Sequence, residues 1–430
     1  MGMGDGAGLT AAMLPGGFAW GAVRAGIKAS GNLDLAVAVT TGASCAVGTA
    51  MFTTNRVVAA PVTVGRRHLL ATGGRVGAVL VNAGNANCAT GQVGADGCMA
   101  TCVAAAEAFG CIFDEVFPSS TGIIGVPFPV EKVVGAVPAL KAVAGSAPEH
   151  AEMFARAIMT TDTLVKMASA VVAVAGESPT EVSEVRIWGA AKGAGMIHPR
   201  LGAPVGASAG GGSAQPHATM LVYLFTDVAA EAGQLSDALA AAVEPSFNSI
   251  SIDGDTSTND TVLLLASGAS GVRLTRELVP AFDAALGGVC RSLARQIVDD
   301  GEGVGHVVTL DVRGAATAAE AKLVAEAIAH SPLCKTAWSS GDPNWGRLLA
   351  AAGYSGAAFE PERVRIWIGA EPVFEYGVRA AGFDEAAAHA AMTQREYTIT
   401  IDLGAGEGAC RFLTCDLTAE YVRINADYST

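Results

Sequence analysis

The sequence predicts a layered protein of the α/β or α+β class. Short runs of β-branched and other apolar residues alternate with alanine-rich stretches along the whole chain. The apolar runs are typical of buried strands, and the alanine-rich stretches are typical of helices. Many of the 53 glycines fall between these segments, where turns are expected. Because strands and helices come in mixed order, we expect sheets that are covered by helices.

These patterns predict the following elements in chain order. Strands are expected at Leu33–Val39, Val76–Val81, Val171–Val174, Val185–Trp188, Met220–Phe225, Thr261–Ala266, His306–Val312, Val364–Ile368 and Tyr397–Leu403. Helices are expected at Asp96–Phe109, Glu149–Met159, Ser236–Val243, Arg276–Val298, Thr317–His330 and Asp384–Thr393. In the stretch Thr317–His330 the apolar residues recur at the spacing of one helix face, so this face is expected to be buried.

Length, charge and cysteine content limit the possible functions. A chain of 430 residues is longer than the roughly 250–300 residues at which one core stops growing, so it holds two domains or one large multilayer core. Its net charge of −14 repels phosphate backbones and anionic lipids, and no apolar stretch reaches membrane-spanning length. A role with nucleic acids or in a membrane is therefore not expected. The nine scattered cysteines form no CxxC pair, which favours a reduced compartment, the cytoplasm.

Several familiar site patterns are missing from the sequence. The glycine clusters Gly193–Gly195 and Gly301–Gly305 lack the full dinucleotide-binding pattern, and there is no Walker A lysine motif. The seven histidines show no metal-ligand spacing, and no GxSxG elbow occurs. A bound nucleotide, a metal centre and an α/β-hydrolase site are therefore not expected.

One segment differs from the rest in composition. The tract Arg200–His217 consists largely of Gly, Ala, Ser and Pro, which predicts a flexible loop. It ends directly before Ala218–Thr219–Met220–Leu221, where a predicted strand begins. Thr219 is thus expected at the junction of a loop and a strand.

Seven short polar motifs stand out from the apolar sequence around them. Each one alone is explained by turn or helix-cap chemistry, because Ser, Thr, Asn and Asp side chains bond to their own backbone there. Seven together favour a polar site. They are Asn82–Asn87, Ser119–Gly125, Thr160–Thr163, Lys192–Ile197, Asp253–Thr261, Asp342–Arg347 and Asn425–Thr430.

In this order the seven motifs resemble those of the ornithine acetyltransferase family, also called the glutamate N-acetyltransferase or ArgJ family. The resemblance runs from Pro15–Phe18 and Gly26–Gly31 to the last residue, and Phe52–Asn55 and Ala59–Pro61 share in it. It implies an αββα sandwich of the DmpA/ArgJ-like type with mixed sheets. It also implies self-cleavage between Ala218 and Thr219. The products are an α fragment, 1–218, and a β fragment, 219–430, which assemble as an α2β2 heterotetramer.

The resemblance implies a catalytic role for three residues. Thr219 is the nucleophile, and its freed α-amine, with an unperturbed pKa of about 7.7–8.0, is the base. Thr121 through its hydroxyl and Gly122 through its N–H stabilise the oxyanion. Lys192 suits a substrate carboxylate, and Glu302 suits a cation. The residues expected to bind substrate are Thr160, Lys192, Thr219, Glu302, Asn425 and Thr430.

The implied reaction is ping-pong transfer of an acetyl group from N2-acetyl-L-ornithine to L-glutamate. These small amino acids are the expected partners. No metal or bound cofactor is required, although some members of the family also use acetyl-CoA as the acetyl donor.

Two segments depart from the usual family pattern. The 18-residue tract Arg200–His217 replaces a short link before Ala218, and extra sequence lies around Gly176–Glu184. Longer loops cost little free energy, so the fold should be kept, whereas self-cleavage depends on alignment at the scissile bond. Other functions stay open at this point: an N-terminal-nucleophile amidohydrolase or aminopeptidase, an acyltransferase for a different N-acylated amino acid, and a non-cleaving binding protein.

Overall fold

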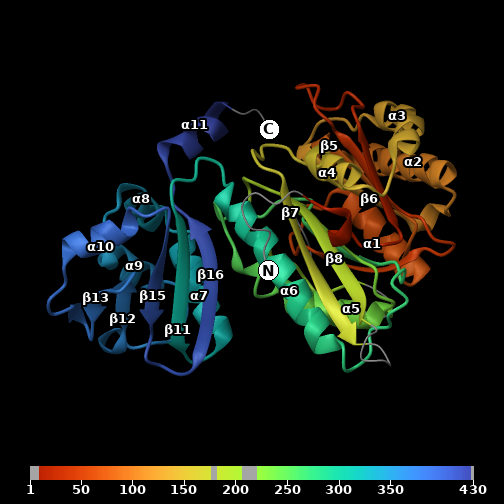
Figure 1. Cartoon of the computed structure of the whole chain (residues 1–430). Helices are drawn as coiled ribbons and strands as arrows, with labels where there is room; N and C mark the ends of the chain where they lie inside the picture. Colours follow the sequence, from red (N-terminus) through yellow and green to blue (C-terminus); the bar gives the residue numbers. More distant parts are fainter. Residues whose placement is uncertain (1–8, 176–181, 206–219, 428–430) are drawn as a thin grey trace.

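The computed structural model describes residues 9–175, 182–205 and 220–427. The chain forms two lobes (Figure 1). The larger lobe contains strands β1–β10 and helices α1–α6, and the smaller lobe contains strands β11–β16 and helices α7–α10. Helix α11 (Ala419–Asp427) leaves the smaller lobe and lies between it and the top of the larger one in this view. None of the described helices is long and apolar enough to cross a bilayer.

The first sheet of the larger lobe has four strands in the order β1-β2-β5-β6. These are β1 (Phe18–Val23), β2 (Leu35–Thr40), β5 (Ala78–Asn85) and β6 (Val116–Ile123). Strands β5 and β6 run parallel, and the other pairs are antiparallel. Helices α2 (Gly91–Phe109) and α3 (Val130–Val143) cover its outer face, while α1 (Ala60–Thr72) packs beside β6 and α4 (Pro148–Ala157) beside β1.

The second sheet has six strands in the order β4-β3-β10-β9-β8-β7. They are β4 (Arg75–Val76), β3 (Ala46–Phe52), β10 (Thr261–Ala266), β9 (Leu221–Thr226), β8 (Val182–Lys192) and β7 (Lys166–Ala175). Its outer face is covered by α5 (Ala232–Val243) and α6 (Val279–Asp299). Strands β9 and β10 are parallel neighbours, so both begin at the same end of the sheet.

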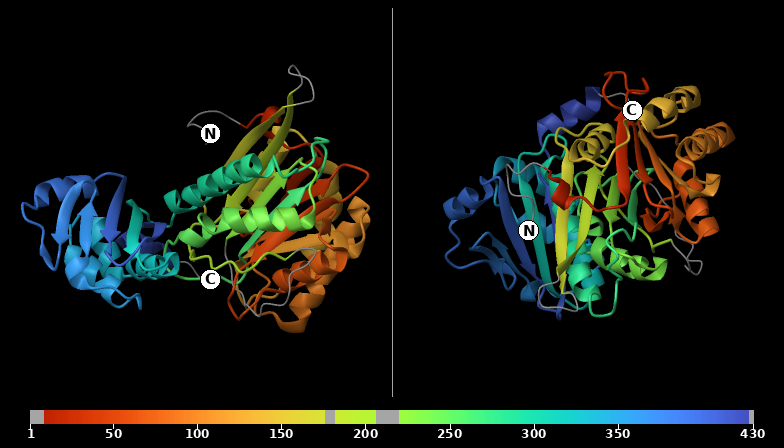
Figure 2. Two further views of the ribbon diagram at one scale, coloured as in Figure 1. Left: turned by 90° about the horizontal axis from the view of Figure 1, so that it is seen from below. Right: turned by 45° about the vertical axis from the view of Figure 1, so that its right-hand side comes forward.

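The inner faces of the two sheets pack on each other around a group of aromatic rings. Trp20 meets Trp188 edge to face with ring centroids 5.2 Å apart, and Phe225 stacks on Trp188 at 5.6 Å. Aromatic pairs of this kind add to the free energy that burial of their area already provides. The order helix, sheet, sheet, helix confirms the predicted αββα sandwich with mixed sheets (Figure 2).

The smaller lobe has one six-stranded sheet in the order β14-β13-β12-β15-β11-β16. Helix α7 (Ala318–Ala329) buries Val324 and Ile328 against it, which confirms the predicted apolar face. The other strands are β11 (Val307–Ala315), β12 (Arg365–Ile368), β13 (Glu371–Glu375), β14 (Val378–Arg379), β15 (Glu396–Asp402) and β16 (Gly408–Cys415). The other helices are α8 (Pro332–Ser340), α9 (Trp345–Gly353) and α10 (Glu385–Met392).

Part of the alanine- and glycine-rich tract is not the flexible loop that its composition predicts. Leu201 and Val205 bridge to Thr53 and Ala50 on the edge of β3. The amide N–H of Val205 donates to the carbonyl of Ala50 at 2.8 Å. Strand β4 is only two residues long, so it leaves this edge of β3 open and the start of the tract pairs there. Residues 206–217 lie outside the described residues, as do 176–181 of the extra sequence between β7 and β8.

Candidate active site

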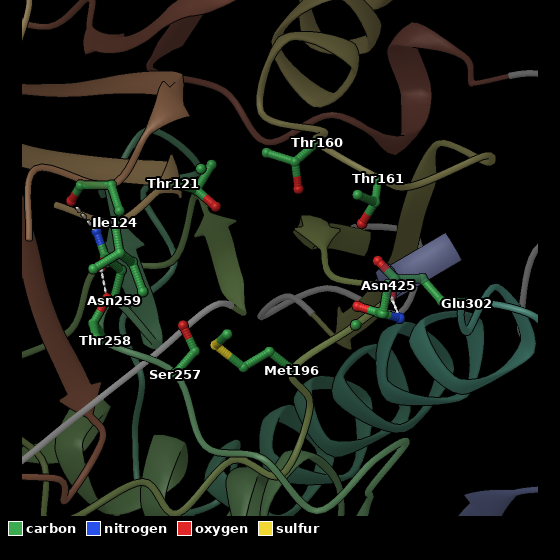
Figure 3. A pocket seen from close by; sticks show the side chains of 13 residues that line it. Thr121, Ile124, Thr160, Thr161, Met196, Ser257, Thr258, Asn259, Glu302 and Asn425 are labelled. Atoms are coloured by element: carbon green, nitrogen blue, oxygen red, sulfur yellow. Dashed lines mark hydrogen bonds between the residues drawn. The ribbon is translucent and has the colours of Figure 1, made fainter. Parts of the chain in front are cut away.

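A pocket of about 110 Å³ opens at the end of the sandwich where β9 and β10 begin and where β6 and β8 end (Figure 3). Its walls come from both sheets, from the loop after α4, from the turn after α6 and from α11. The pocket therefore combines segments that are more than 300 residues apart in sequence. The lining residues are Ala86, Thr121, Gly122, Ile124, Thr160, Thr161, Gly195, Met196, Ser257, Thr258, Asn259, Glu302 and Asn425.

Six of the seven polar motifs contribute to this pocket, and the seventh does not. The motif Asp342–Arg347 lies in the smaller lobe, where the Asn344 side chain caps the N-terminus of α9 and Trp345 stacks on Phe374 with ring centroids 5.1 Å apart. For this motif the helix-cap explanation is the correct one. A local cap and a site residue use the same amino acids, so the sequence alone does not separate them.

Thr121 and Gly122 occupy the C-terminal end of β6 and face the pocket. Gly122 has a φ of +130°, and a Cβ there would lie 2.3 Å from the carbonyl carbon of Gly84 on β5. Only glycine fits this close approach of two strands. The backbone of Gly122 therefore forms part of the pocket wall with no side chain to cover it, next to the Thr121 hydroxyl.

The wall around Thr121 is held by buried amide side chains. Asn259 donates through Nδ2 to the carbonyl oxygens of Ala86 and Ser120, both at 2.6 Å. The Ser120 hydroxyl donates to Asn82 Oδ1 at 2.6 Å. These bonds join the end of the first sheet to the segment before β10, and a fully bonded buried network is rigid. The position of Thr121 is thus fixed by its neighbours.

Lys192, the last residue of β8, is buried, with 1% of its surface exposed. Its Nζ donates to Thr160 Oγ1 at 2.6 Å and to Thr121 Oγ1 at 3.1 Å. Burial lowers the pKa of Lys192, and the nearby carboxylate of Asp162 acts against that shift. Lys192 is not among the described residues that line the pocket, whereas its partners Thr121 and Thr160 both line it.

A second buried cation organises the loop after α4. Lys166 Nζ donates to Asp162 Oδ1 at 2.7 Å and to Asp300 Oδ2 at 2.5 Å, and all three side chains are at most 3% exposed. Burial alone would raise the pKa of Asp162, but Lys192 and Lys166 outweigh it and hold that pKa at about 2. Asp162 also accepts the N–H of Thr160 at 2.9 Å, so the ionic network sets the position of this pocket residue.

Glu302 and Asn425 form the wall at the C-terminal end of the chain (Figure 3). Asn425 Nδ2 donates to Glu302 Oε2 at 2.9 Å, and the Glu302 N–H donates to the carbonyl of Ala194 at 2.8 Å. A Cβ on Gly195 would lie 2.4 Å from the Glu302 carboxylate, so glycine leaves room for it. This wall carries a negative charge that faces the Thr121 wall across the cavity.

The start of β9 contacts a buried carboxylate. The Met220 N–H donates to Asp260 Oδ1, and the Met220 carbonyl accepts from the N–H of Thr261 at 3.0 Å. Asp260 is 1% exposed and lies near Lys192. The predicted site residues Ala218, Thr219 and Thr430 lie outside the described residues.

The sequence analysis did not assign a role to eight lining residues, although all eight belong to its motifs. Met196 is one of them. Its φ of +57° is unusual for a non-glycine residue, and Asp253 accepts its N–H at 2.6 Å and that of Ile197 at 2.9 Å. This strained backbone directs the Met196 side chain into the pocket. The other unassigned residues are Ala86, Ile124, Thr161, Gly195, Ser257, Thr258 and Asn259.

The close approach at Gly122 gives a first prediction. A Gly122→Ala chain should lose most of its activity and unfold at a lower temperature, because a Cβ strains the backbone by about 1–3 kcal/mol and also collides with β5. Gly125→Ala is the matched control, since its φ is +78° but no atom lies within 4 Å of its Cβ position. Thermal unfolding and a product assay should separate the two. Equal effects in both variants would mean that strain alone matters.

Comparison with known proteins adds independent findings. The model of the ArgJ family matches residues 19–430. An arginine biosynthesis bifunctional protein ArgJ from Thermus thermophilus is 44% identical over 420 residues, which cover 98% of this chain and 100% of that protein. The corresponding protein of Geobacter sulfurreducens is 41% identical over 417 residues, covering 96% and 99%.

Two solved structures with more than 30% sequence identity each cover about half of this chain. A crystal structure of arginine biosynthesis bifunctional protein ArgJ from Bacillus halodurans is 41% identical, with a TM-score of 0.45, and covers 47% of this chain and 96% of that one. Ornithine acetyltransferase from Mycobacterium tuberculosis, complexed with ornithine, is 35% identical, with a TM-score of 0.39, and covers 45% and 96%.

Proposed function

The chain belongs to the ArgJ family, and from this premise we propose that it is a self-cleaving N-terminal-threonine acyltransferase of arginine biosynthesis. It moves an acetyl group from N2-acetyl-L-ornithine to L-glutamate. The observation that carries the proposal is the pocket itself. Thr121, Gly122, Thr160, Glu302 and Asn425, five residues that the family resemblance assigns to the reaction, line one cavity at the end of the sheet where β9 begins.

We propose that the chain releases its own nucleophile. The Thr219 hydroxyl attacks the carbonyl carbon of Ala218, and the acyl group shifts from nitrogen to oxygen. Water then hydrolyses the ester, which leaves a carboxylate on Ala218 and a free α-amine on Thr219. This amine has an unperturbed pKa of about 7.7–8.0, so it can accept a proton near neutral pH. Nucleophile and base then belong to one residue.

The transfer follows as two acyl exchanges. Thr219 Oγ attacks the acetyl carbonyl while its α-amine takes the hydroxyl proton, and the oxyanion is stabilised by the Thr121 hydroxyl and the Gly122 N–H. The intermediate collapses, the proton passes to the leaving nitrogen, and ornithine departs from an acetyl-threonine ester. The amine of glutamate then attacks the ester through the same oxyanion and becomes acetylated. Thr219 is regenerated.

The Glu302 wall suits the substrates. Its carboxylate is bonded to Asn425 and lies across the cavity from Thr121, so it can hold the distal ammonium of ornithine while the acetyl group faces Thr121. Thr430 belongs to the same substrate site in this proposal.

The proposal also includes the surroundings of the enzyme. The two fragments form an α2β2 heterotetramer in the cytoplasm, and no metal or bound cofactor takes part. The support for a reduced compartment is that the nine cysteines are scattered along the sequence and form no CxxC pair. Acetyl-CoA is a second acetyl donor for glutamate.

A product assay tests the reaction. The purified protein is mixed with N2-acetyl-L-ornithine, with and without L-glutamate, and ornithine is measured. Ornithine that forms only in the presence of glutamate, together with N-acetylglutamate, supports transfer. Equal release without glutamate would indicate a hydrolase instead. Replacing acetylornithine by acetyl-CoA tests the second donor, and other N-acylated amino acids test for a specialised substrate.

A further inference from the structure

The hydrogen bonds of Lys192 determine what the two threonines in front of it can do. An ammonium group has three donors and no acceptor. Because Lys192 Nζ bonds to Thr121 Oγ1 at 3.1 Å and to Thr160 Oγ1 at 2.6 Å, both hydroxyl oxygens must act as acceptors toward it. Neither hydroxyl proton can therefore point at Lys192.

The same two hydroxyl protons have no other acceptor within the described part of the chain. The only hydrogen bond of either Oγ1 atom to a described residue is the one to Lys192. Both side chains line the cavity, and Figure 3 shows them directed into it. Each O–H is thus left to donate to whatever occupies the pocket.

We propose that Lys192 is a positioning residue that turns Thr121 and Thr160 into a matched pair of hydrogen-bond donors facing the pocket. The inference rests on the proposed function, in which Thr121 stabilises the oxyanion. The positive charge of Lys192 also polarises both O–H groups, and hydrogen bonds in such a chain strengthen one another. A bound ligand must then present two acceptor oxygens, one for each hydroxyl: the reacting carbonyl oxygen at Thr121 and a neighbouring carbonyl or carboxylate oxygen at Thr160.

The buried surroundings keep Lys192 in this role. Asp162 lies nearby and accepts the N–H of Gly193, the residue that follows Lys192, at 2.6 Å. The same carboxylate accepts the N–H of Thr160 at 2.9 Å. One anion therefore holds the backbone beside the cation and the backbone of one of its two partners, which fixes the geometry of the donor pair.

This role differs from direct binding of a substrate carboxylate by Lys192, which the family resemblance implies. Direct binding makes Lys192 matter for affinity, so its loss should raise KM. Positioning of an oxyanion donor makes it matter in the transition state, so its loss should lower kcat with little change in KM.

A double-mutant cycle tests the proposal, with Lys192→Met, Thr121→Val and the combined variant assayed for ornithine release. Removing one oxyanion donor costs about 100- to 1,000-fold in kcat, and we expect a loss of that size in each single variant. Because Lys192 acts through the Thr121 hydroxyl, adding Lys192→Met to Thr121→Val should cost much less than it does alone. Independent, multiplying losses, or a raised KM with unchanged kcat, would overturn the proposal.

A substrate analogue gives a second measurement. The carboxamide of N2-acetylornithine lacks the charge of the α-carboxylate but keeps a carbonyl oxygen that can accept from Thr160, so the preference of the wild type for the acid should persist in Lys192→Met. If that preference disappears, Lys192 binds the carboxylate directly and the proposal fails. Should Lys192→Met not fold, as judged by circular dichroism, Thr160→Ser and Thr160→Val replace it. Serine should keep the activity, valine should lower it, and equal activities would overturn the donor pair.

The outcomes also separate this inference from the proposed function. A wild-type protein that forms no N-acetylglutamate would refute the acetyltransferase assignment. Independent losses in an active wild type would refute only the role of Lys192.

Discussion

A Thr219→Ala chain should remain one polypeptide of about 43 kDa and should have no acetyltransferase activity. Alanine lacks the hydroxyl that starts the N-to-O acyl shift, so no free α-amine forms and no nucleophile exists. Removal of the Thr219 hydroxyl oxygen therefore prevents both the cleavage and the catalysis. We expect a single band near the full mass of 43.2 kDa on a denaturing gel, where the wild type gives two fragments.

The matched control is Thr219→Ser, which keeps a hydroxyl at the same position. It should still be cleaved. N-terminal sequencing of its β fragment should begin at position 219, which places the cut after Ala218. Activity in Thr219→Ala, or an intact wild type that is nevertheless active, would contradict the assignment of Thr219 as an N-terminal nucleophile.

The described residues on both sides of the segment 206–219 are bonded to their neighbours in the fold. Met220 directly precedes β9, a central strand of the second sheet, and its N–H donates to the buried carboxylate of Asp260. The tract upstream is also tied at its start, where Val205 bridges to Ala50. Val205 and Met220, the described residues on either side of this segment, are therefore both bonded to the second sheet or to the segment before β10.

Much of the fold could be predicted from the sequence. Thr261–Ala266 is reproduced residue for residue as β10, and every predicted helix overlaps an observed one. Strands β1 and β3 were missed because glycines interrupt their apolar runs, yet here a side chain at Gly48 would collide with Leu265 across the β3–β10 pair. Glycine signals a turn in a sequence, and in a tightly packed sheet it also signals close contact.

The sequence predicted which residues make up the site, but not which of them are partners in hydrogen bonds and ion pairs. The motifs identified the strands and loops that meet at the pocket because polar residues are rare in such apolar sequence. The pairing of Lys192 with two threonines depends on the end of β8 lying close to the end of β6 in the other sheet and to the loop after α4, contacts between residues that no local pattern connects. The same holds for Lys166, whose partner Asp300 is 134 residues away.

A Lys166→Met chain should be less stable than the wild type by about 3–5 kcal/mol, because removing one partner leaves buried charges uncompensated. The two carboxylates of Asp162 and Asp300 lose their shared cation, and both are almost fully buried. Such a loss is a large part of the roughly 5–15 kcal/mol that stabilises a folded protein. Chemical denaturation measures it, and Lys141→Met on the exposed face of α3 is the control.

The pH dependence shows whether the buried charge is the cause. In the wild type, the pKa of Asp162 is held at about 2, below its unfolded value, so its contribution to stability is present above pH 4 and lost as the pH falls toward 2. Without Lys166 the pKa of Asp162 rises, since burial is then opposed mainly by Lys192. Because protonation removes the buried charge that Lys166 compensates in the wild type, the deficit of the variant should shrink as the pH is lowered from about 4 toward 2. A deficit that does not change with pH would mean that lost packing of the Lys166 side chain, and not the unpaired carboxylates, destabilises the variant.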